Sequence, residues 1–264
     1  MIPQLSFVEV GVYLYPIVLT NMRSITSLFL YLLMVGLTFC QDSTAQQILE
    51  KYRINAGGEE LWESLESISF QGNIIMGEET YPIKVTQVKP NLQRVEMVIR
   101  KDTVVQAFDG QRAWILNPLN GNPAPSFLPE DQLLEWQSNS LDNNLFGTVK
   151  KGLTPTLLGK IKVDDRDAYM ISLANQEQIL EFYFIDPDLY RPMLNRKIIP
   201  TGPARGQRLE TYMSNYRETE GYMLPYTLET RINGQLIQQI NWETIEVQQE
   251  VDTRVFIYPP LLTK

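Results

Sequence analysis

The sequence has no histidine and only one cysteine, Cys40, in 264 residues. Without histidine the chain cannot build Ser-His-Asp or Cys-His catalytic systems, and most zinc sites are excluded. A single cysteine excludes an intrachain disulfide and a thiolate zinc cluster. Carboxylates, lysines, tyrosines and hydroxyls remain for chemistry. We therefore expect a non-enzymatic protein with no catalytic residues, no metal and no cofactor.

Clusters of basic residues are also missing. The net charge is −8, and lysines and arginines occur singly or in pairs along the chain. Nucleic acid and anionic membrane surfaces are poor partners for such a chain. With 44% hydrophobic and 20% charged residues, the composition is that of a globular protein and not of a disordered one.

Two apolar segments open the chain, and the second, residues 27–39, contains no charged residue. It is shorter than the ~20 residues that cross a bilayer, but it fits a signal-peptide core of ~7–15 residues. Arg23, next to Met22, supplies the positive charge that precedes such a core. We therefore expect the true start at Met22, with residues 1–21 an extension. A membrane anchor formed by both segments is the alternative.

Cys40 lies where the apolar run ends. Thr38 and Cys40 fit positions −3 and −1 of a signal-peptidase cut after Cys40, whereas the bulky Phe39 disfavours a lipoprotein box. We expect residues 1–40 to be an N-terminal extension and signal peptide, and residues 41–264 to form one domain in the periplasm. Lipid anchoring at Cys40 is the alternative.

The pattern after the signal predicts a little helix and then many strands. A helical pattern from Ser43 ends at Gly57-Gly58, and a short second helix follows. From Ile68 apolar residues alternate with polar ones, and Asp109-Gly110 and Asn233-Gly234 are typical of hairpin turns. Roughly ten or eleven strands follow one another as sequence neighbours, which predicts an antiparallel meander. The fold class is mainly β with a few helices.

One stretch interrupts the strands between residues 121 and 146. It opens with Gly and Pro, and Pro129 then begins a helix. We expect this insertion to form a lid over the sheet, with the apolar side chains Leu133, Leu134 and Trp136.

Carboxylates within strands allow one enzymatic interpretation. Glu96, Glu181 and Glu210 lie in predicted strands, and a pair of carboxylates can hydrolyse glycosides. Polar faces of antiparallel strands carry glutamates routinely, however. A carbohydrate-active enzyme is therefore kept only as an alternative.

The apolar face of the predicted sheet is the more informative feature. Such a face must be covered or closed, and the predicted helices are few. A curved sheet wrapped around them leaves a concave apolar cleft, which suits acyl chains. Each side chain of this face, taken alone, is more often a core residue than a ligand contact. We expect the lipid-binding face of the early strands to present Phe70, Ile74, Met76, Ile83, Val85, Val95, Met97, Trp114 and Leu116.

The order of several segments resembles the outer-membrane lipoprotein-sorting-protein-like family of the LolA/LolB-like superfamily. The segments are "ILEKYRINAGGEELWESLESISFQGNI", "VVQAFDGQRAWILNPLNG", "FYFIDPDLYRPM", "ETYMSNYRETEGYMLPYTLETRINGQ" and "VDTRVFIYP". They span nearly all of residues 45–260. The resemblance implies an incomplete, strongly curved antiparallel β-barrel closed by helices. It also implies an apolar cavity for lipoprotein acyl chains, or, in sensor relatives, for lipid-modified and stress-signal ligands.

We therefore expect a monomeric periplasmic protein that holds a lipid or the acyl chain of a lipoprotein, with lipoprotein sorting to the outer membrane as its setting. The alternative is an envelope sensor or protein-interaction module with an envelope protein partner and a cavity filled by its own side chains.

Overall fold

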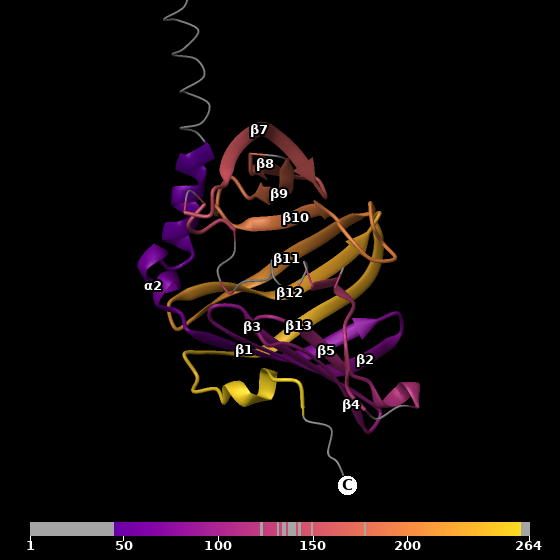
Figure 1. Ribbon diagram of the computed structural model, residues 1–264. Coiled ribbons are helices and arrows are strands. Elements are labelled where there is room, and N and C mark those ends of the chain that lie inside the picture. Colours follow the sequence, from indigo (N-terminus) through magenta and orange to yellow (C-terminus); the bar gives the residue numbers. More distant parts are fainter. Residues whose placement is uncertain are drawn as a thin grey trace, which may run out of the picture. The chain divides into compact units, whose positions relative to one another are not determined.

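The computed structural model describes residues 45–121, 124–130, 132–133, 136, 141, 144–148, 150–176 and 178–259. Thirteen strands form one antiparallel sheet in this part of the chain (Figure 1). They are β1 (Ser67–Met76), β2 (Glu79–Val88), β3 (Leu92–Ile99), β4 (Asp102–Phe108), β5 (Ala113–Leu116), β6 (Ser126–Phe127), β7 (Thr154–Val163), β8 (Arg166–Ala174), β9 (Ile179–Ile185), β10 (Pro192–Ile198), β11 (Arg208–Thr219), β12 (Tyr222–Ile232) and β13 (Gln235–Val247).

The sheet consists of two meanders joined by their first and last strands. Its order is β6-β5-β4-β3-β2-β1-β13-β12-β11-β10-β9-β8-β7. β1 pairs with β2 on one side and with β13 on the other, so the beginning and the end of the sheet meet. The free edges are β6 and β7, which are neighbours in sequence. Residues 128–153 between them, here called the crossing segment, therefore connect one edge of the sheet to the other.

The predicted antiparallel meander is confirmed, but the predicted count of roughly ten or eleven strands is too low. The turns at Asp109-Gly110 and Asn233-Gly234 connect β4 to β5 and β12 to β13. Asn233 and Gly234 both have positive φ, of 50° and 85°, as the tightest hairpin turns require. β6, one strand that the sequence does not indicate, has two residues in a Pro-rich stretch.

Few helices accompany the sheet. One helix covers residues 45–55, followed by α2 (Glu59–Ser64) and two 3-10 turns, η1 (Pro118–Asn120) and η2 (Thr253–Phe256). Residues 130, 132–133 and 136 of the crossing segment are also helical. The two glycines between the first helix and α2 have positive φ, which ends the first helix as predicted. Trp62 of α2 donates its indole N–H to Ala56 O at 2.9 Å, and this bond fixes α2 to the end of the first helix.

The sheet has a concave and a convex face. Figure 1 shows it curving so that β1–β5 and β7–β10 lie on opposite sides of an interior. We call the face that carries Ile74, Ile83 and Ile171 the concave face. The main core cluster forms there and includes side chains of both meanders and Leu49 of the first helix. On the opposite, convex face, Trp114 donates its indole N–H to Phe256 O of η2 at 2.7 Å.

The sequence-based predictions for the first 40 residues lie outside the described part of the chain. These are the start at Met22, the signal peptide and the fate of Cys40. Contacts group residues 45–264 as one compact unit. None of the helices among the described residues is both long enough and apolar enough to cross a membrane.

We expect the junction of the two meanders to be sensitive at Gly72. A Cβ at this position would meet Asn241 O and lie 2.8 Å from Trp242 Cα, both backbone atoms of β13. Gly72→Ala should therefore lower the free energy of unfolding by about 3 kcal/mol, because the strands must separate to admit the methyl group. Chemical denaturation measures the effect.

Gly77→Ala is the matched control. Gly77 has φ +63°, and a Cβ at this position would have no heavy atom within 4 Å, so only backbone strain of about 1 kcal/mol is expected there. Equal losses for the two variants would contradict the importance of close contact at the junction.

Candidate ligand-binding face

Seven of the side chains predicted to bind lipid lie together on the concave face. Ile74 and Ile83 are buried at 5% and 7% exposure and belong to the main core cluster. The other five are half-buried and pack against that cluster: Phe70, Met76, Val85, Val95 and Met97. The strand register explains this grouping. Ile83 is paired with Gly72 and Met97, and Val85 with Phe70 and Val95, across β1, β2 and β3.

Trp114 and Leu116 lie on the convex face, so the prediction of one shared face needs correction for these two residues. They pair with Ala107 and Val105 of β4, and Val105 in turn pairs with Glu96 of β3. Glu96 alternates with Val95 and Met97 and therefore points to the other face. The sequence shows alternation within each strand but does not determine the phase of β5 relative to β3, because that phase depends on two intervening turns.

On the convex face, Trp114 and Leu116 line a cavity of about 430 Å³. The remaining walls come from β3, β4 and the segment after β13, with Arg94, Val105, Arg254, Val255, Ile257, Tyr258 and Pro259. Arg94 donates to Val255 O at 2.7 Å and to Glu96 Oε1 at 2.9 Å. These bonds hold the C-terminal segment against the sheet.

The second meander contributes apolar side chains that the sequence analysis did not select. Tyr226 and Trp242 are buried in the main core cluster, and Leu228 and Ile240 pack against it half-buried. Ile240 pairs with Ile74 of β1 and with Leu228 of β12. The alternation of Ile240 and Trp242 in β13 is a sequence signal for a strand face. Its position beside β1 is known only from the pairing.

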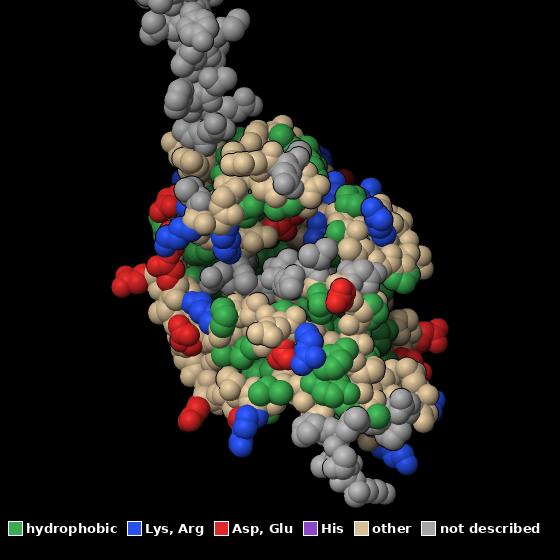
Figure 2. All heavy atoms as spheres, in the orientation of Figure 1, with side chains coloured by type: hydrophobic (Ala, Val, Ile, Leu, Met, Phe, Trp, Pro, Cys, Tyr) green, Lys and Arg blue, Asp and Glu red, His purple; other side chains and the backbone are tan. Residues whose placement is uncertain are grey.

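Parts of the chain itself cover the concave face. Ile48, Leu49 and Tyr52 of the first helix and Leu145 and Phe146 of the crossing segment belong to the same core cluster. Phe146 stacks on Trp62, with ring centroids 4.9 Å apart. In Figure 2 hydrophobic side chains gather above and below the hollow in the face shown.

Among the residues predicted to form a lid, Leu133 and Trp136 are helical and half-buried. Leu134 lies outside the described residues. The role of these residues as a lid stays a prediction.

Polar contacts attach the crossing segment to its surroundings, and two of them lie near the main core cluster. Arg53 of the first helix donates to Leu145 O at 3.1 Å and to Thr148 Oγ1 at 3.4 Å. Asn144 Nδ2 donates to Glu181 Oε1 of β9 at 2.6 Å. Both attachments are hydrogen bonds that a displacement of the segment would break.

Glu181 is a buried carboxylate on the concave face. It pairs in register with Leu173, a member of the main core cluster, and is 7% exposed. Besides the bond from Asn144, its Oε2 accepts from Asn195 Nδ2 of β10 at 2.8 Å. Burial, and next the negative charge of Glu181, raise the pKa of the nearby Tyr183 well above its ordinary value of 10.0.

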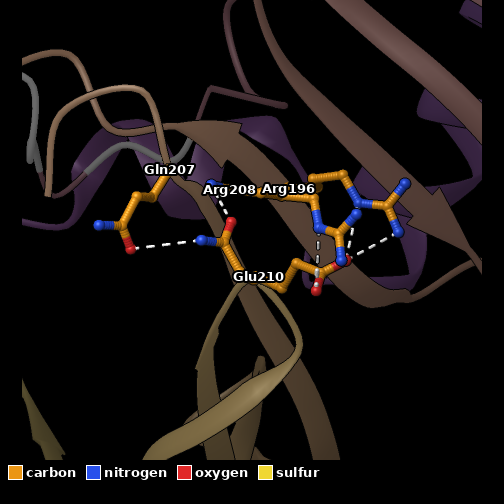
Figure 3. Close-up of polar contacts among 5 residues, drawn as sticks. Arg196, Gln207, Arg208 and Glu210 are labelled. Carbon is orange, nitrogen blue, oxygen red and sulfur yellow. Dashed lines mark hydrogen bonds and ion pairs between the residues drawn. The ribbon is translucent and has the colours of Figure 1, made fainter.

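The three strand glutamates considered above, Glu96, Glu181 and Glu210, do not pair with one another as glycosidase carboxylates do. Arg196 pairs with both Phe182 and Glu210, which places Glu210 on the convex face, opposite to Glu181. Figure 3 shows the Glu210 carboxylate facing Arg196 and Arg208, at 2.8 and 3.4 Å. Glu96 is also on the convex face, but β3 and β11 are five strand spacings apart, about 24 Å at ~4.8 Å each. Glycosidase carboxylates are separated by about 5–9.5 Å.

Solved structures with a similar fold come from several bacteria. A domain of Vibrio parahaemolyticus named for outer membrane lipoprotein sorting superposes with a TM-score of 0.52 at 9% identity. A LolA superfamily protein of Nitrosomonas europaea gives 0.50 at 14% identity. In both cases 81% of this chain and 97% of the other chain are covered. The chain has a LolA-like fold.

A DUF1329 family protein of Desulfovibrio piger gives a TM-score of 0.51 at 9% identity, with the same coverage of 81% and 97%. No family model and no curated protein matches the sequence. The LolA-like fold predicted from the order of the segments is thus confirmed by the tertiary structure. At sequence identities of 9–14% the similarity shows the fold alone.

We expect Tyr183 to make stability decline at alkaline pH. Its pKa in the folded state lies above 10.0, so its contribution is complete below pH 10 and is lost as the pH rises beyond it. Between pH 9 and pH 11, Tyr183→Phe should lose less free energy of unfolding than the parent protein, by about 1.4 kcal/mol. Urea denaturation at both pH values measures the difference, and parallel losses in the two proteins would refute it.

Proposed function

We propose that this LolA-like protein is a non-enzymatic, periplasm-facing binding protein that holds a lipid or a lipoprotein acyl chain on its concave face. The observation that carries the proposal is the row of half-buried apolar side chains on β1–β3. These side chains pack on the core from one side and retain accessible surface on the other. A fully buried core would leave no such surface for a ligand.

An acyl chain matches this face chemically. Its chain has no hydrogen-bonding groups, and this part of the face is apolar: it consists of Phe70, Val85, Val95 and Met97, with Leu228 and Ile240 on the second meander. Burying apolar surface contributes about 25 cal/mol per Å² before the costs of association. The long, curved shape of the face suits a linear chain.

The proposed location rests on the N-terminal sequence. Export by the signal peptide that we expect in residues 1–40 would deliver the domain to the periplasm. There, lipid or acylated lipoprotein is the partner that the apolar face suits, and lipoprotein sorting to the outer membrane is the process that we propose. Cleavage after Cys40 and lipidation of Cys40 are both compatible with this location.

A second candidate function follows from the cover on the same face. Tyr52 of the first helix and Phe146 of the crossing segment pack with each other, ring centroids 5.4 Å apart, in the main core cluster. If such side chains fill the interior completely, the protein is an envelope sensor or protein-interaction module without a lipid ligand. Direct detection of a bound lipid separates the two functions.

We expect lipid to accompany the protein during purification from membranes. Native mass spectrometry in a gentle detergent should show an added mass of a lipid or an acylated peptide, because apolar burial makes release slow. If the measured mass is consistently that of the protein without a ligand, the result favours the module whose interior is filled by its own side chains.

Met97→Glu should weaken the binding of a fluorescent acyl probe at least tenfold while the fold remains intact. Met97 is half-buried on the concave face, and a carboxylate there must be desolvated against the acyl chain. Probe titration measures the affinity, and circular dichroism reports the fold.

Val98→Glu is the matched control. Val98 is the next residue of β3, alternates to the convex face and is 36% exposed. Its substitution should leave probe affinity unchanged. A similar loss in both variants would mean that the probe does not bind on the concave face.

A further inference from the structure

We propose that Glu181 selects the ligand of the concave face, favouring acyl ligands with a neutral or cationic N–H donor, such as N-acyl amides, over free fatty acids. This inference rests on the proposed acyl-chain binding and adds the class of headgroup to it. It follows from the position of Glu181, from the chemistry of its partners and from the absence of a cation beside it among the described residues.

The first observation is the isolation of the charge. Among the described residues, Glu181 and Glu210 are the only charged side chains in the buried class, at 7% and 3% exposure. Glu210 lies on the convex face and is paired with Arg196 and Arg208. Glu181 is thus the buried charge of the concave face within the described part of the chain.

The second observation is that the partners of Glu181 do not neutralise it. Its two oxygens accept amide N–H groups from Asn144 and Asn195, at 2.6 and 2.8 Å. No Lys or Arg nitrogen of the described residues lies within 4.0 Å of it. Lys197 is opposite Glu181 in register on β10 but makes no ion pair with it. Among the described residues, Glu181 is therefore a carboxyl group held by neutral donors, without a cation against it, on a largely apolar face.

The partners also show which groups the site accepts. A carboxylate has about four acceptor positions, and the amides of Asn144 and Asn195 and the hydroxyl of Tyr183 occupy three of them, so one further donor can be accepted. Asn144 belongs to the crossing segment, and the amide N–H that it presents is the same type of group as the N–H of an N-acyl amide. A ligand with such a donor can add to Glu181 or replace Asn144 without leaving the carboxylate unpaired.

A ligand carboxylate meets the opposite conditions. Like charges repel most strongly where the surroundings are apolar, and an anion offers Glu181 no hydrogen to accept. A free fatty acid whose chain lies on the concave face would have to keep its headgroup away from β9. Donor-bearing and anionic ligands of equal chain length should therefore differ in affinity.

The test compares two probes with the same acyl chain. Oleate and N-oleoylethanolamine displace the neutral dye N-phenyl-1-naphthylamine from the purified protein at pH 8, below the concentrations at which the probes aggregate. We expect N-oleoylethanolamine to bind at least tenfold more tightly than oleate. Glu181→Gln keeps the size of the side chain and removes its charge, so it should bring the two affinities within threefold, mainly through tighter binding of oleate.

Two control variants separate this effect from general ones. Glu210→Gln removes the other buried carboxylate, and Lys197→Met removes the cation opposite Glu181. Both should retain the preference for the amide. Thermal unfolding verifies that each variant is folded, and the comparison of probes in the parent protein needs no variant at all.

The outcomes distinguish the inference from the proposed function. If the parent protein binds both probes equally, or if Glu181→Gln retains the full preference, Glu181 does not select the ligand, while acyl binding stands. If neither probe nor dye binds the folded parent protein, the proposed function itself fails.

Discussion

The pairing of β1 with β13 is the interaction on which the rest of the structure depends. Each meander forms from local hairpins, but only this pairing makes one sheet of the two and brings residues about 170 positions apart into register. It leaves β6 and β7 as the free edges, so the chain must connect the two edges through the crossing segment. Gly72 shows how close the two strands are, because β13 leaves no space there for a Cβ.

The curvature of the joined sheet gives its two faces different chemistry. The concave face collects apolar side chains from both meanders around one buried carboxylate, Glu181, whose partners among the described residues are amide and hydroxyl groups. The convex face pairs its buried carboxylate, Glu210, with two arginines. The two buried carboxylates thus differ in their partners, and the proposed selection of ligands by Glu181 depends on this difference.

The same apolar face serves both stability and the proposed function. The first helix and the crossing segment bury part of it with Leu49, Tyr52 and Phe146, while Met97 and Val95 remain half-buried. A ligand chain would extend this packing through the hydrophobic effect, which also holds the first helix and the crossing segment on this face. Two hydrogen bonds oppose displacement of the crossing segment. Arg53 of the first helix donates to Leu145 O, and Asn144 donates to Glu181 of β9.

The sequence by itself determined the local features of this protein. Period-two alternation and the turns at Asp109-Gly110 and Asn233-Gly234 predicted the meander, since a strand face and a tight turn are set by a few adjacent residues. Alternation also grouped Phe70 through Met97 on one face. Only the tertiary structure decided that Trp114 and Leu116 point to the convex face. The alternation within β5 does not show which of its residues share a face with those of β3, because two turns lie between these strands. The contact of Glu181 with Asn144 of the crossing segment likewise depends on the assembled sheet, because the sequence does not show where that segment lies.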